Sequence, residues 1–417
     1  MVEQKAAVAM MEIEQSELRR VSEAFGYTLV STARLTGGYA SSNFAAVLKA
    51  PDGADFTAVL KFSYAAMPRE EIEHQLAVLS ALEQHGFATN YLLPKLGAAP
   101  DAGLCERYLV TAEDGGGPWV VLVTFVKGTA GDKLLGAADA ALERTMLESL
   151  GATLARLHAV PWEPAALGAL RSIECGYPVC NTGELLRPGE VEQALQGVSH
   201  PFVGFLLGAR LERFRALYAG CALPSGFIHG DAFLDNCLFA EGGGLAALVD
   251  WEDSCTAPHV LDVAICISAA SCVGRRSGAR PPPPASPRTP RPCRCRRAAA
   301  ASLGQRQMGS RWPATGPSFR TQAACFSAEN ELQSHRCAHI LRGYTAQRPL
   351  GEAELGALAD FMWAGALACG FYRWREFNIN RPESSDETKQ AYLIMQRRCE
   401  LLEATPLDPR AWLATPP

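Results

Sequence analysis

The sequence predicts an α+β protein with two lobes, in which an antiparallel sheet and one helix precede a mostly helical region. Three observations predict this arrangement. Strand-like segments joined by turns dominate the first 126 residues, helical periodicity dominates the rest, and 417 residues with 48% hydrophobic content can bury a core of this size. We therefore expect an N-terminal lobe over residues 1–126 and a C-terminal lobe over residues 127–417.

The N-terminal lobe follows from its turns. SELRRVSEAFGY predicts a short helix. Strands separated by a Gly-rich turn and a PDG turn are expected at 28–35, 43–49 and 56–62, which is typical of an antiparallel meander. Further strands are expected near 107–111 and 119–125.

One helix is expected between these strands, over residues 68–86. It begins with Pro68 and acidic residues, repeats apolar residues at Ile72, Leu76 and Leu79, and stops at Gly86. In the second half, helices are expected over residues 138–158 and 258–272.

Residues 274–325 interrupt the helical pattern. From Gly274 to Arg320 the chain has eleven arginines, no lysine and no acidic residue, with PPPP among them. No apolar face is available to offset the entropy of ordering, so the composition predicts a disordered insertion, with a functional basic arm as the alternative. Without these arginines the formal charge moves from -5 to -16, so the remaining chain is acidic.

Charge and cysteine usage favour a cytoplasmic protein. A net charge of -5 gives no reason to expect nucleic acid or an anionic membrane as a partner. The N-terminus is too acidic for a signal or transit peptide, and no apolar run approaches the length of a membrane span. The fourteen cysteines lack the spacing of a disulfide framework or zinc site. The pattern does not indicate an oligomeric state.

Polar residues gather between two strand-like runs in FIHGDAFLDNCLF, residues 227–239. Asp231 precedes Asn236 by five residues, and Asp250 follows the next strand-like run. The ends of two strands would bring these oxygen-bearing groups together, and such groups suit magnesium bound to nucleotide phosphates. Asp231 would deprotonate an attacking hydroxyl, while Asn236 and Asp250 would hold the metal. The alternative is an Asx-rich turn that caps its own backbone.

A lysine upstream fits the same chemistry. Lys61 lies in an apolar strand, so its ammonium needs a partner or a phosphate oxygen. We expect Glu73 on the following helix to pair with it, with Glu70 and Glu71 as alternatives. The turn GGYASSN, which contains Gly37 and Gly38, would lay backbone amides over phosphates, although it is not a Walker loop.

HGDxxxxN, the later aspartate, the strand lysine and GATLARLHAV resemble the aminoglycoside phosphotransferase and choline kinase group of small-molecule kinases. The resemblance covers residues 35–262 and resumes near residue 328. It implies a protein-kinase-like bilobal fold, with ATP and magnesium as cofactors. It also implies Asp231 as catalytic base, Asn236 and Asp250 as magnesium ligands, and Lys61 as the phosphate-binding residue.

The resemblance further implies that residues 123–126, including Val123 and Phe125, form the hinge that contacts adenine. In this motif His229 is a structural hydrogen-bonding residue. Trp251 and Glu252 follow Asp250 where protein kinases have Phe-Gly, so a protein kinase is a weaker interpretation.

The C-terminal segment FMWAGALACGFYRWREFNINRPE resembles the homoserine kinase-like branch of this group. A homoserine-like acceptor carries a carboxylate and an ammonium, which need an arginine fork and an acid. Arg375, with Arg373 in reserve, and Glu252 or Asp253 are the candidates. We therefore expect an ATP-dependent kinase that acts on a hydroxyl of a small amino acid or amino alcohol, with homoserine as the leading acceptor.

The alternative acceptors are hydroxylysine, because GGYASSNF and LKFS also resemble hydroxylysine kinases, and choline or an aminoglycoside. A hypothesis of another class is a catalytically inactive, nucleotide-binding pseudokinase.

Overall fold

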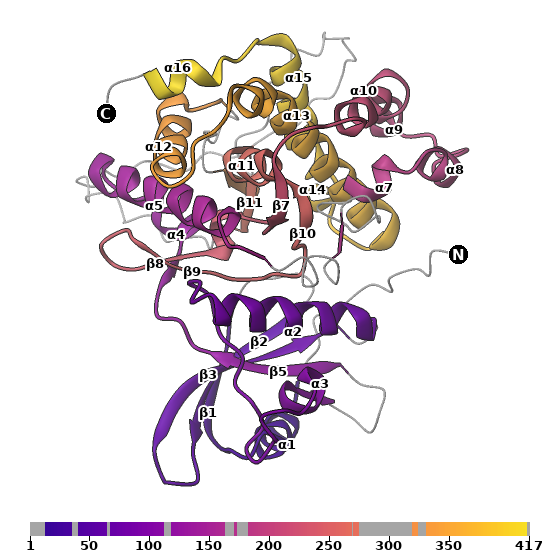
Figure 1. Cartoon of the computed structure of the whole chain (residues 1–417). Coiled ribbons are helices and arrows are strands. Elements are labelled where there is room, and N and C mark those ends of the chain that lie inside the picture. The colour runs from indigo at the N-terminus through magenta and orange to yellow at the C-terminus, as the bar shows by residue number, and fades with distance from the viewer. Residues whose placement is uncertain are drawn as a thin grey trace, which may run out of the picture.

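The computed structural model describes residues 13–35, 41–64, 67–111, 118–162, 171–172, 182–268, 270–274, 319–323 and 331–414. A sheet with helix α2 lying across it forms one lobe, and a larger group of helices forms the other (Figure 1). The α+β class and the protein-kinase-like bilobal arrangement predicted from the sequence are confirmed.

The N-terminal lobe is built from α1 (Gln15–Ala24), β1 (Thr28–Arg34), β2 (Ser41–Lys49), β3 (Asp55–Ser63), α2 (Arg69–Gln84), α3 (Leu104–Tyr108), β4 (Leu109–Thr111) and β5 (Trp119–Thr124). Its strands form one antiparallel sheet in the order β1-β2-β3-β5-β4. The predicted meander and the helix that follows it are thus present. One boundary was wrong: residues 104–108 form α3, and only 109–111 are a strand.

Alternation along β3 decides which side chains face each layer. Leu60 and Phe62 are buried in a cluster that includes α1, whereas Val59 and Lys61 lie on the opposite face of the sheet. That opposite face is the one α2 covers, and Val121 and Val123 of β5 belong to the same side. The pleat therefore directs Lys61 toward α2 and the second lobe.

The C-terminal lobe opens with β6 (Thr129–Ala130), α4 (Gly131–Leu134), α5 (Ala140–His158), α7 (Thr182–Leu186), α8 (Glu190–Ala194), α9 (Pro201–Leu206) and α10 (Ala209–Tyr218). It continues with β7 (Ser225–Ile228), the 3₁₀ turn η2 (Leu234–Asn236), β8 (Cys237–Phe239), β9 (Leu245–Leu248), β10 (Cys255–Pro258), α11 (His259–Ser268) and β11 (Ala270–Gly274). It ends with β12 (Phe319–Ala323), α12 (Ser334–Thr345), α13 (Glu352–Arg375), the π-helical turn η3 (Glu376–Asn380), α14 (Asp386–Lys389), α15 (Tyr392–Ala404) and α16 (Pro409–Ala414).

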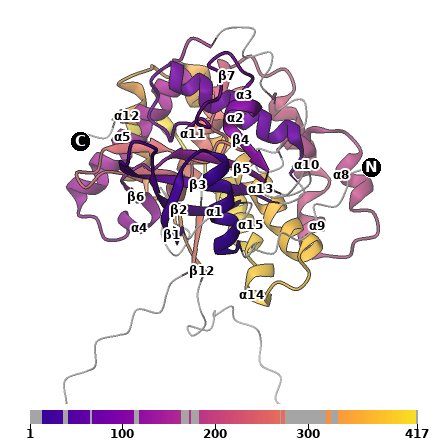
Figure 2. The same cartoon turned by 90° about the horizontal axis from the view of Figure 1, so that it is seen from below.

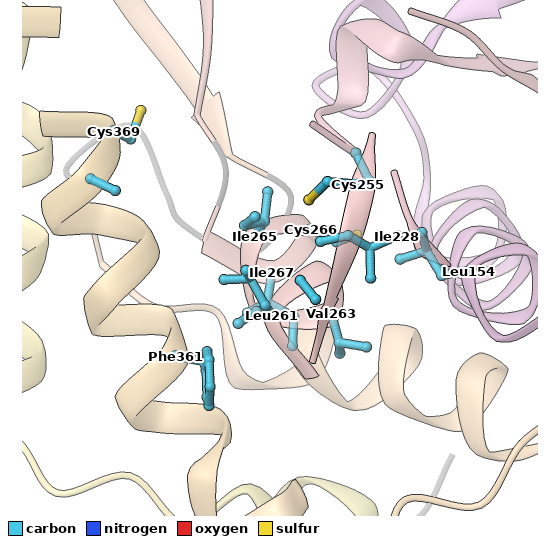
Figure 3. Packing of buried hydrophobic residues seen from close by; sticks show 14 of the residues in the cluster. Leu154, Ile228, Cys255, Leu261, Val263, Ile265, Cys266, Ile267, Phe361 and Cys369 are labelled. Carbon is cyan, nitrogen blue, oxygen red and sulfur yellow. The ribbon is translucent and has the colours of Figure 1, made fainter. Parts of the chain in front are cut away.

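Helix α11 forms the centre of this lobe. All ten of its residues are buried, so it is apolar around most of its circumference. Figure 3 shows its side chains between α13 and the paired strands β7 and β10, with the labelled residues Leu261, Val263, Ile265 and Ile267 among them. Strand β7 leads directly into the HGD motif. The packing of α11 against β7 therefore fixes the position of the strand from which the motif starts.

Helix α13 and the turn after it, Glu352–Asn380, are long and apolar enough to span a membrane by length and composition. No apolar run of that length was expected from the sequence. In the structure 67% of that apolar stretch is buried. Trp363 and Trp374 are each 1% exposed. The helix packs against α11 and α15 (Figure 1), which is the environment of a core helix.

The helix expected over residues 258–272 ends earlier, at Ser268. Residues 270–274 instead pair with residues 319–323 as antiparallel strands, so β12 satisfies their backbone groups. Figure 2 shows β12 at the lower edge of the molecule in that view. Residues 275–318, most of the predicted insertion, lie outside the described part of the chain.

Candidate active site

The HGD motif leaves β7 as a loop whose backbone is held by a buried carboxylate. Asp262 on α11 accepts hydrogen bonds from the backbone N–H groups of His229 and Gly230, each at 3.0 Å. Burial works to raise the pKa of Asp262, but the hydrogen bond from His158 opposes it, and the pKa is lowered. The loop that carries Asp231 is therefore anchored by charge-assisted hydrogen bonds.

Two further residues hold Asp262 in place. His158, the last residue of α5, donates from Nε2 to Asp262 Oδ2 at 3.0 Å and accepts at Nδ1 from the hydroxyl of Tyr344 at 2.7 Å. These partners are 104 and 186 residues away from His158 in sequence, so the connection arises only in the fold. No local pattern in the sequence marks Asp262 or Tyr344 as contributors to the site.

His229 has the predicted structural arrangement. Its side chain is fully buried, and burial lowers its pKa, which favours the neutral ring. Nε2 donates to the carbonyl of Val249 at 3.1 Å, and Nδ1 accepts from the backbone N–H of Asp231 at 3.2 Å. The imidazole thus joins the catalytic loop to the strand end before Asp250.

Asp231 and Asn236 meet as the sequence predicts. Asn236 Nδ2 donates to Asp231 Oδ2 at 2.7 Å and to the Asp231 carbonyl at 2.9 Å. Burial, followed by the charges of Asp253, Asp235, Asp250 and Glu252, raises the pKa of Asp231 well above its usual value. A carboxylate with a raised pKa is suited to accept a proton, so the position fits a general base.

Asp250 lies across from this pair, bonded to Lys61. Lys61 Nζ donates to Asp250 Oδ1 at 2.7 Å, and the two side chains are 17% and 26% exposed. Burial alone would raise the pKa of Asp250, but the adjacent ammonium outweighs it and lowers the pKa. The contact joins the N-terminal sheet to the second lobe across 189 residues of sequence.

The backbone at Asp250 is unusual. Asp250 is the one non-glycine residue with positive φ, at 70°, in the described part of the chain. A left-handed conformation costs about 1–3 kcal/mol and persists only where its surroundings fix it. Trp251, which is 2% exposed and donates from Nε1 to Thr89 Oγ1 at 2.8 Å, supplies that fixation.

A pocket opens beside the ion pair. Lys61 and Asp250 line it with Gln75 of α2, and Val123 of the predicted hinge forms part of its apolar wall. Phe125, the other predicted hinge residue, is 42% exposed. Gly37 and Gly38, predicted to cover the phosphates, lie outside the described residues.

The predicted pairing of Glu73 with Lys61 is wrong. Glu73 lies on the solvent side of α2, where Arg69 Nε contacts it at 2.8 Å and its side chain is 46% exposed. The core face of α2 contains Ile72, Leu76 and Leu79, and Glu73 falls outside it. Glu71, one of the two alternatives, accepts a hydrogen bond from Tyr64 at 3.2 Å. The acidic side chain that pairs with Lys61 is Asp250.

The predicted acceptor residues divide into two groups. Glu252 and Asp253 lie on the turn after Asp250, close enough to raise the pKa of Asp231. Arg375, at the end of α13, instead forms an ion pair with Glu184 of α7 and lies over the ring of Phe371. The structure thus places the two acids beside the base and engages the arginine elsewhere.

Arg171 is a second cationic residue near the site, and it was not predicted from the sequence. The carbonyl of Arg171 accepts from the backbone N–H of Thr256 on β10 at 2.8 Å, which holds Arg171 beside the strand that follows the Asp250 turn. Its guanidinium charge acts on His74, whose pKa burial lowers to about 4. No motif marked Arg171 in the sequence.

The donor set fits a magnesium ion that binds together with a nucleotide. Among the described residues no group of three or more His, Cys, Asp and Glu side chains forms a metal cage. Magnesium is commonly held by one or two protein oxygen ligands and by substrate phosphates, and it retains several waters. Asn236 and Asp250 provide that number of ligands.

Comparison with known proteins identifies a family and several relatives of this chain. The model of the phosphotransferase enzyme family matches residues 31–284, more than half of the chain. A homoserine kinase of Gluconobacter oxydans is 26% identical over 387 residues, covering 89% of this chain and 90% of that protein. A homoserine kinase of Acidiphilium cryptum is 29% identical over 252 residues, covering 58% and 55% of the two chains.

Solved structures share the fold at lower identity. An ethanolamine kinase of Plasmodium vivax has a TM-score of 0.56 and 11% identity, with 98% of this chain and 94% of that chain covered. The GDP complex of an aminoglycoside 2′-phosphotransferase has a TM-score of 0.52 and 12% identity, with 93% and 100% covered. At these identities the structures bear on the fold alone.

Proposed function

The chain belongs to the phosphotransferase enzyme family, and on that premise we propose that it transfers the γ-phosphate of ATP to the hydroxyl of homoserine. It is a small-molecule kinase of the homoserine kinase-like branch. The observation that carries the proposal is the meeting of Lys61, from the N-terminal lobe, with Asp250 and the nearby Asp231–Asn236 pair of the second lobe at the interface between the lobes.

In the proposed mechanism Asp231 accepts the proton of the acceptor hydroxyl. Its raised pKa and its hydrogen bond from Asn236 keep the carboxylate basic and oriented. Lys61 binds the phosphates of ATP. Asn236 and Asp250 would hold magnesium, which when bound neutralises charge on the phosphates. The protein mainly positions the two reactants, since phosphoryl transfer needs little covalent participation from it.

The acceptor assignment depends on charge. Homoserine carries an ammonium, for which Glu252 and Asp253 beside Asp231 are the proposed partners. Its carboxylate needs a guanidinium fork, for which Arg375 is the first candidate and Arg171 the second. Arg375 would have to exchange Glu184 for the substrate, whereas Arg171 is already tethered to the strand beside the acidic turn.

The 26% identity to a homoserine kinase over most of both chains supports this acceptor over hydroxylysine, choline and aminoglycosides. The retained base, lysine and oxygen ligands support an active enzyme over an inactive nucleotide-binding pseudokinase. We further propose that the enzyme works in the cytoplasm, since the fourteen cysteines follow no disulfide pattern.

An acceptor panel tests the proposal. Purified protein with ATP and magnesium is given homoserine, hydroxylysine, choline or an aminoglycoside, and ADP formation is measured. We expect the highest kcat/KM for homoserine. A preference for choline, which has no carboxylate, would remove the homoserine assignment and leave the kinase assignment standing.

Arginine variants then locate the carboxylate. Arg375→Lys and Arg171→Lys are compared, because a point charge does not replace the planar fork. We expect the Lys variant of the arginine that binds the acceptor to have an acceptor KM about tenfold higher than the unmodified protein. The KM of ATP should be unchanged. If neither variant alters acceptor kinetics, the carboxylate is bound elsewhere.

A further inference from the structure

One polar group in the pocket beside Lys61 has no function in the account above. The pocket lies between β3, β5 and α2. Gln75 of α2 lines it and is 5% exposed. Its amide nitrogen is buried and has no hydrogen-bond partner among the described residues. The position is not accidental, since Gln75 lies on the face of α2 that includes Ile72, Leu76 and Leu79.

An unpaired buried amide donor is costly compared with an apolar side chain of the same size. The surrounding walls would accept such a side chain, since Leu76, Val121 and Val123 are apolar and buried. A glutamine at this point therefore indicates that its partner arrives with a ligand.

The neighbours of Gln75 define the chemistry of that partner. Lys61 places a cation in the same pocket, and Gln75 adds a neutral donor. A cation and an N–H donor side by side complement an anionic oxygen. The anion now present, Asp250, is bonded to Lys61 through one oxygen. A bound nucleotide would bring further anionic oxygens to Lys61.

We propose that Gln75 is a nucleotide-binding residue that donates a hydrogen bond from its side-chain amide to a phosphate oxygen beside Lys61. This inference rests on the proposed function, since it assumes that the nucleotide binds at Lys61. Gln75 would then take the place of the acidic partner that was expected on α2. Because its amide is neutral, it leaves the charge of Lys61 available for phosphate.

The first test substitutes methionine, which keeps the length of the side chain and removes the donor. Gln75→Met should leave the melting temperature of the ligand-free protein unchanged or raise it, because a buried unpaired donor has been removed. The same variant should weaken ADP binding about tenfold or more, measured by calorimetry with magnesium present. A residue with only a structural role would instead lower the melting temperature and leave ADP affinity unchanged.

Adenosine and a second variant identify the contact. Adenosine has no phosphate, so Gln75→Met should bind it as the unmodified protein does. Gln75→Glu should weaken ADP binding more than methionine does, because a carboxylate repels phosphate. Equal or tighter ADP binding by Gln75→Glu would overturn the proposal, since the residue would then act as an acceptor for Lys61. Loss of adenosine binding would also overturn it.

A matched control separates these outcomes from general effects on the helix. Gln84→Met changes the exposed last residue of α2 and should alter neither ADP binding nor the melting temperature. If the unmodified protein binds no ADP, the proposed function fails. If it binds ADP and Gln75→Met binds it equally well, only the assignment of Gln75 fails.

Discussion

Replacement of the proposed base, Asp231→Asn, should remove activity and stabilise the fold. Asparagine retains an oxygen that can accept the hydrogen bond Asn236 now donates at 2.7 Å, so the loop geometry is preserved. It cannot accept a proton from the acceptor hydroxyl. A positioned general base contributes about 10²–10⁴ in rate, so turnover should fall at least a hundredfold, or about 2.7 kcal/mol in barrier height.

The stabilisation follows from the raised pKa of Asp231. Burial and four neighbouring carboxylates disfavour its charged form in the folded state. The folded protein therefore binds this proton more tightly than the unfolded chain does, and stability is lost as pH rises through the raised pKa. Asp231→Asn avoids that loss. Its stabilising effect should be present above the raised pKa and should disappear below the ordinary carboxyl pKa.

Two assays check both statements. ADP release measured at saturating ATP gives the turnover, and thermal unfolding without ligand gives stability across the pH range. Nucleotide binding by the variant should persist. Near-normal turnover in Asp231→Asn would refute its role as base, and a lower melting temperature at neutral pH would refute the electrostatic reasoning.

Three other changes have distinct expected outcomes. Asp250→Ala removes the carboxylate that pairs with Lys61, so it should destabilise the protein by about 2 kcal/mol. It should also raise the magnesium concentration needed for ADP binding, and an unchanged magnesium titration would count against Asp250 as a ligand. Gly343→Ala would place a β-carbon 2.6 Å from the carbonyl carbon of Glu148 on α5, so the free energy of unfolding, measured by chemical denaturation, should fall by at least about 3 kcal/mol. Unchanged stability would mean that α5 and α12 separate easily. Gly274 pairs with Phe319, so a two-residue Asn-Gly turn in place of residues 275–318 should retain turnover within about twofold, whereas insoluble protein would show that the segment is needed for folding.

The sequence was most informative where a pattern is local. Strand-like runs bounded by a Gly-rich turn and a PDG turn predicted β2 and β3. In the structure, burial alternates along both strands and places Lys61 on the face opposite Leu60. The five-residue spacing from Asp231 to Asn236 predicted a loop that the structure closes with a 2.7 Å hydrogen bond. In both cases the partners lie within one or two elements, so the period or the spacing determines their relation.

The Glu73 prediction was wrong because it relied on charge and disregarded helical phase. Ile72, Leu76 and Leu79 already defined the inner face of α2, and position 75 completes that i, i+3, i+4, i+7 pattern. The signal for Gln75 was therefore present in the sequence. A glutamine on an apolar face was the observation to follow.

Other parts of the site depend on contacts that no local pattern encodes. Asp262 meets Gly230 of the HGD loop across 32 residues, and Tyr344 reaches His158 across 186. Close packing of α5 on α12 at Gly343 makes the second contact possible. Such contacts depend on how whole helices pack, and a single sequence does not specify that packing.

The central claim, phosphoryl transfer to an acceptor hydroxyl at Asp231, is tested most directly by the product. Phosphorus NMR of the protein with ATP, magnesium and homoserine follows each phosphate as it moves. The account predicts a new phosphomonoester signal that grows in step with ADP and is absent with Asp231→Asn. Formation of ADP with inorganic phosphate alone, or a phosphomonoester signal that persists in Asp231→Asn, would contradict it.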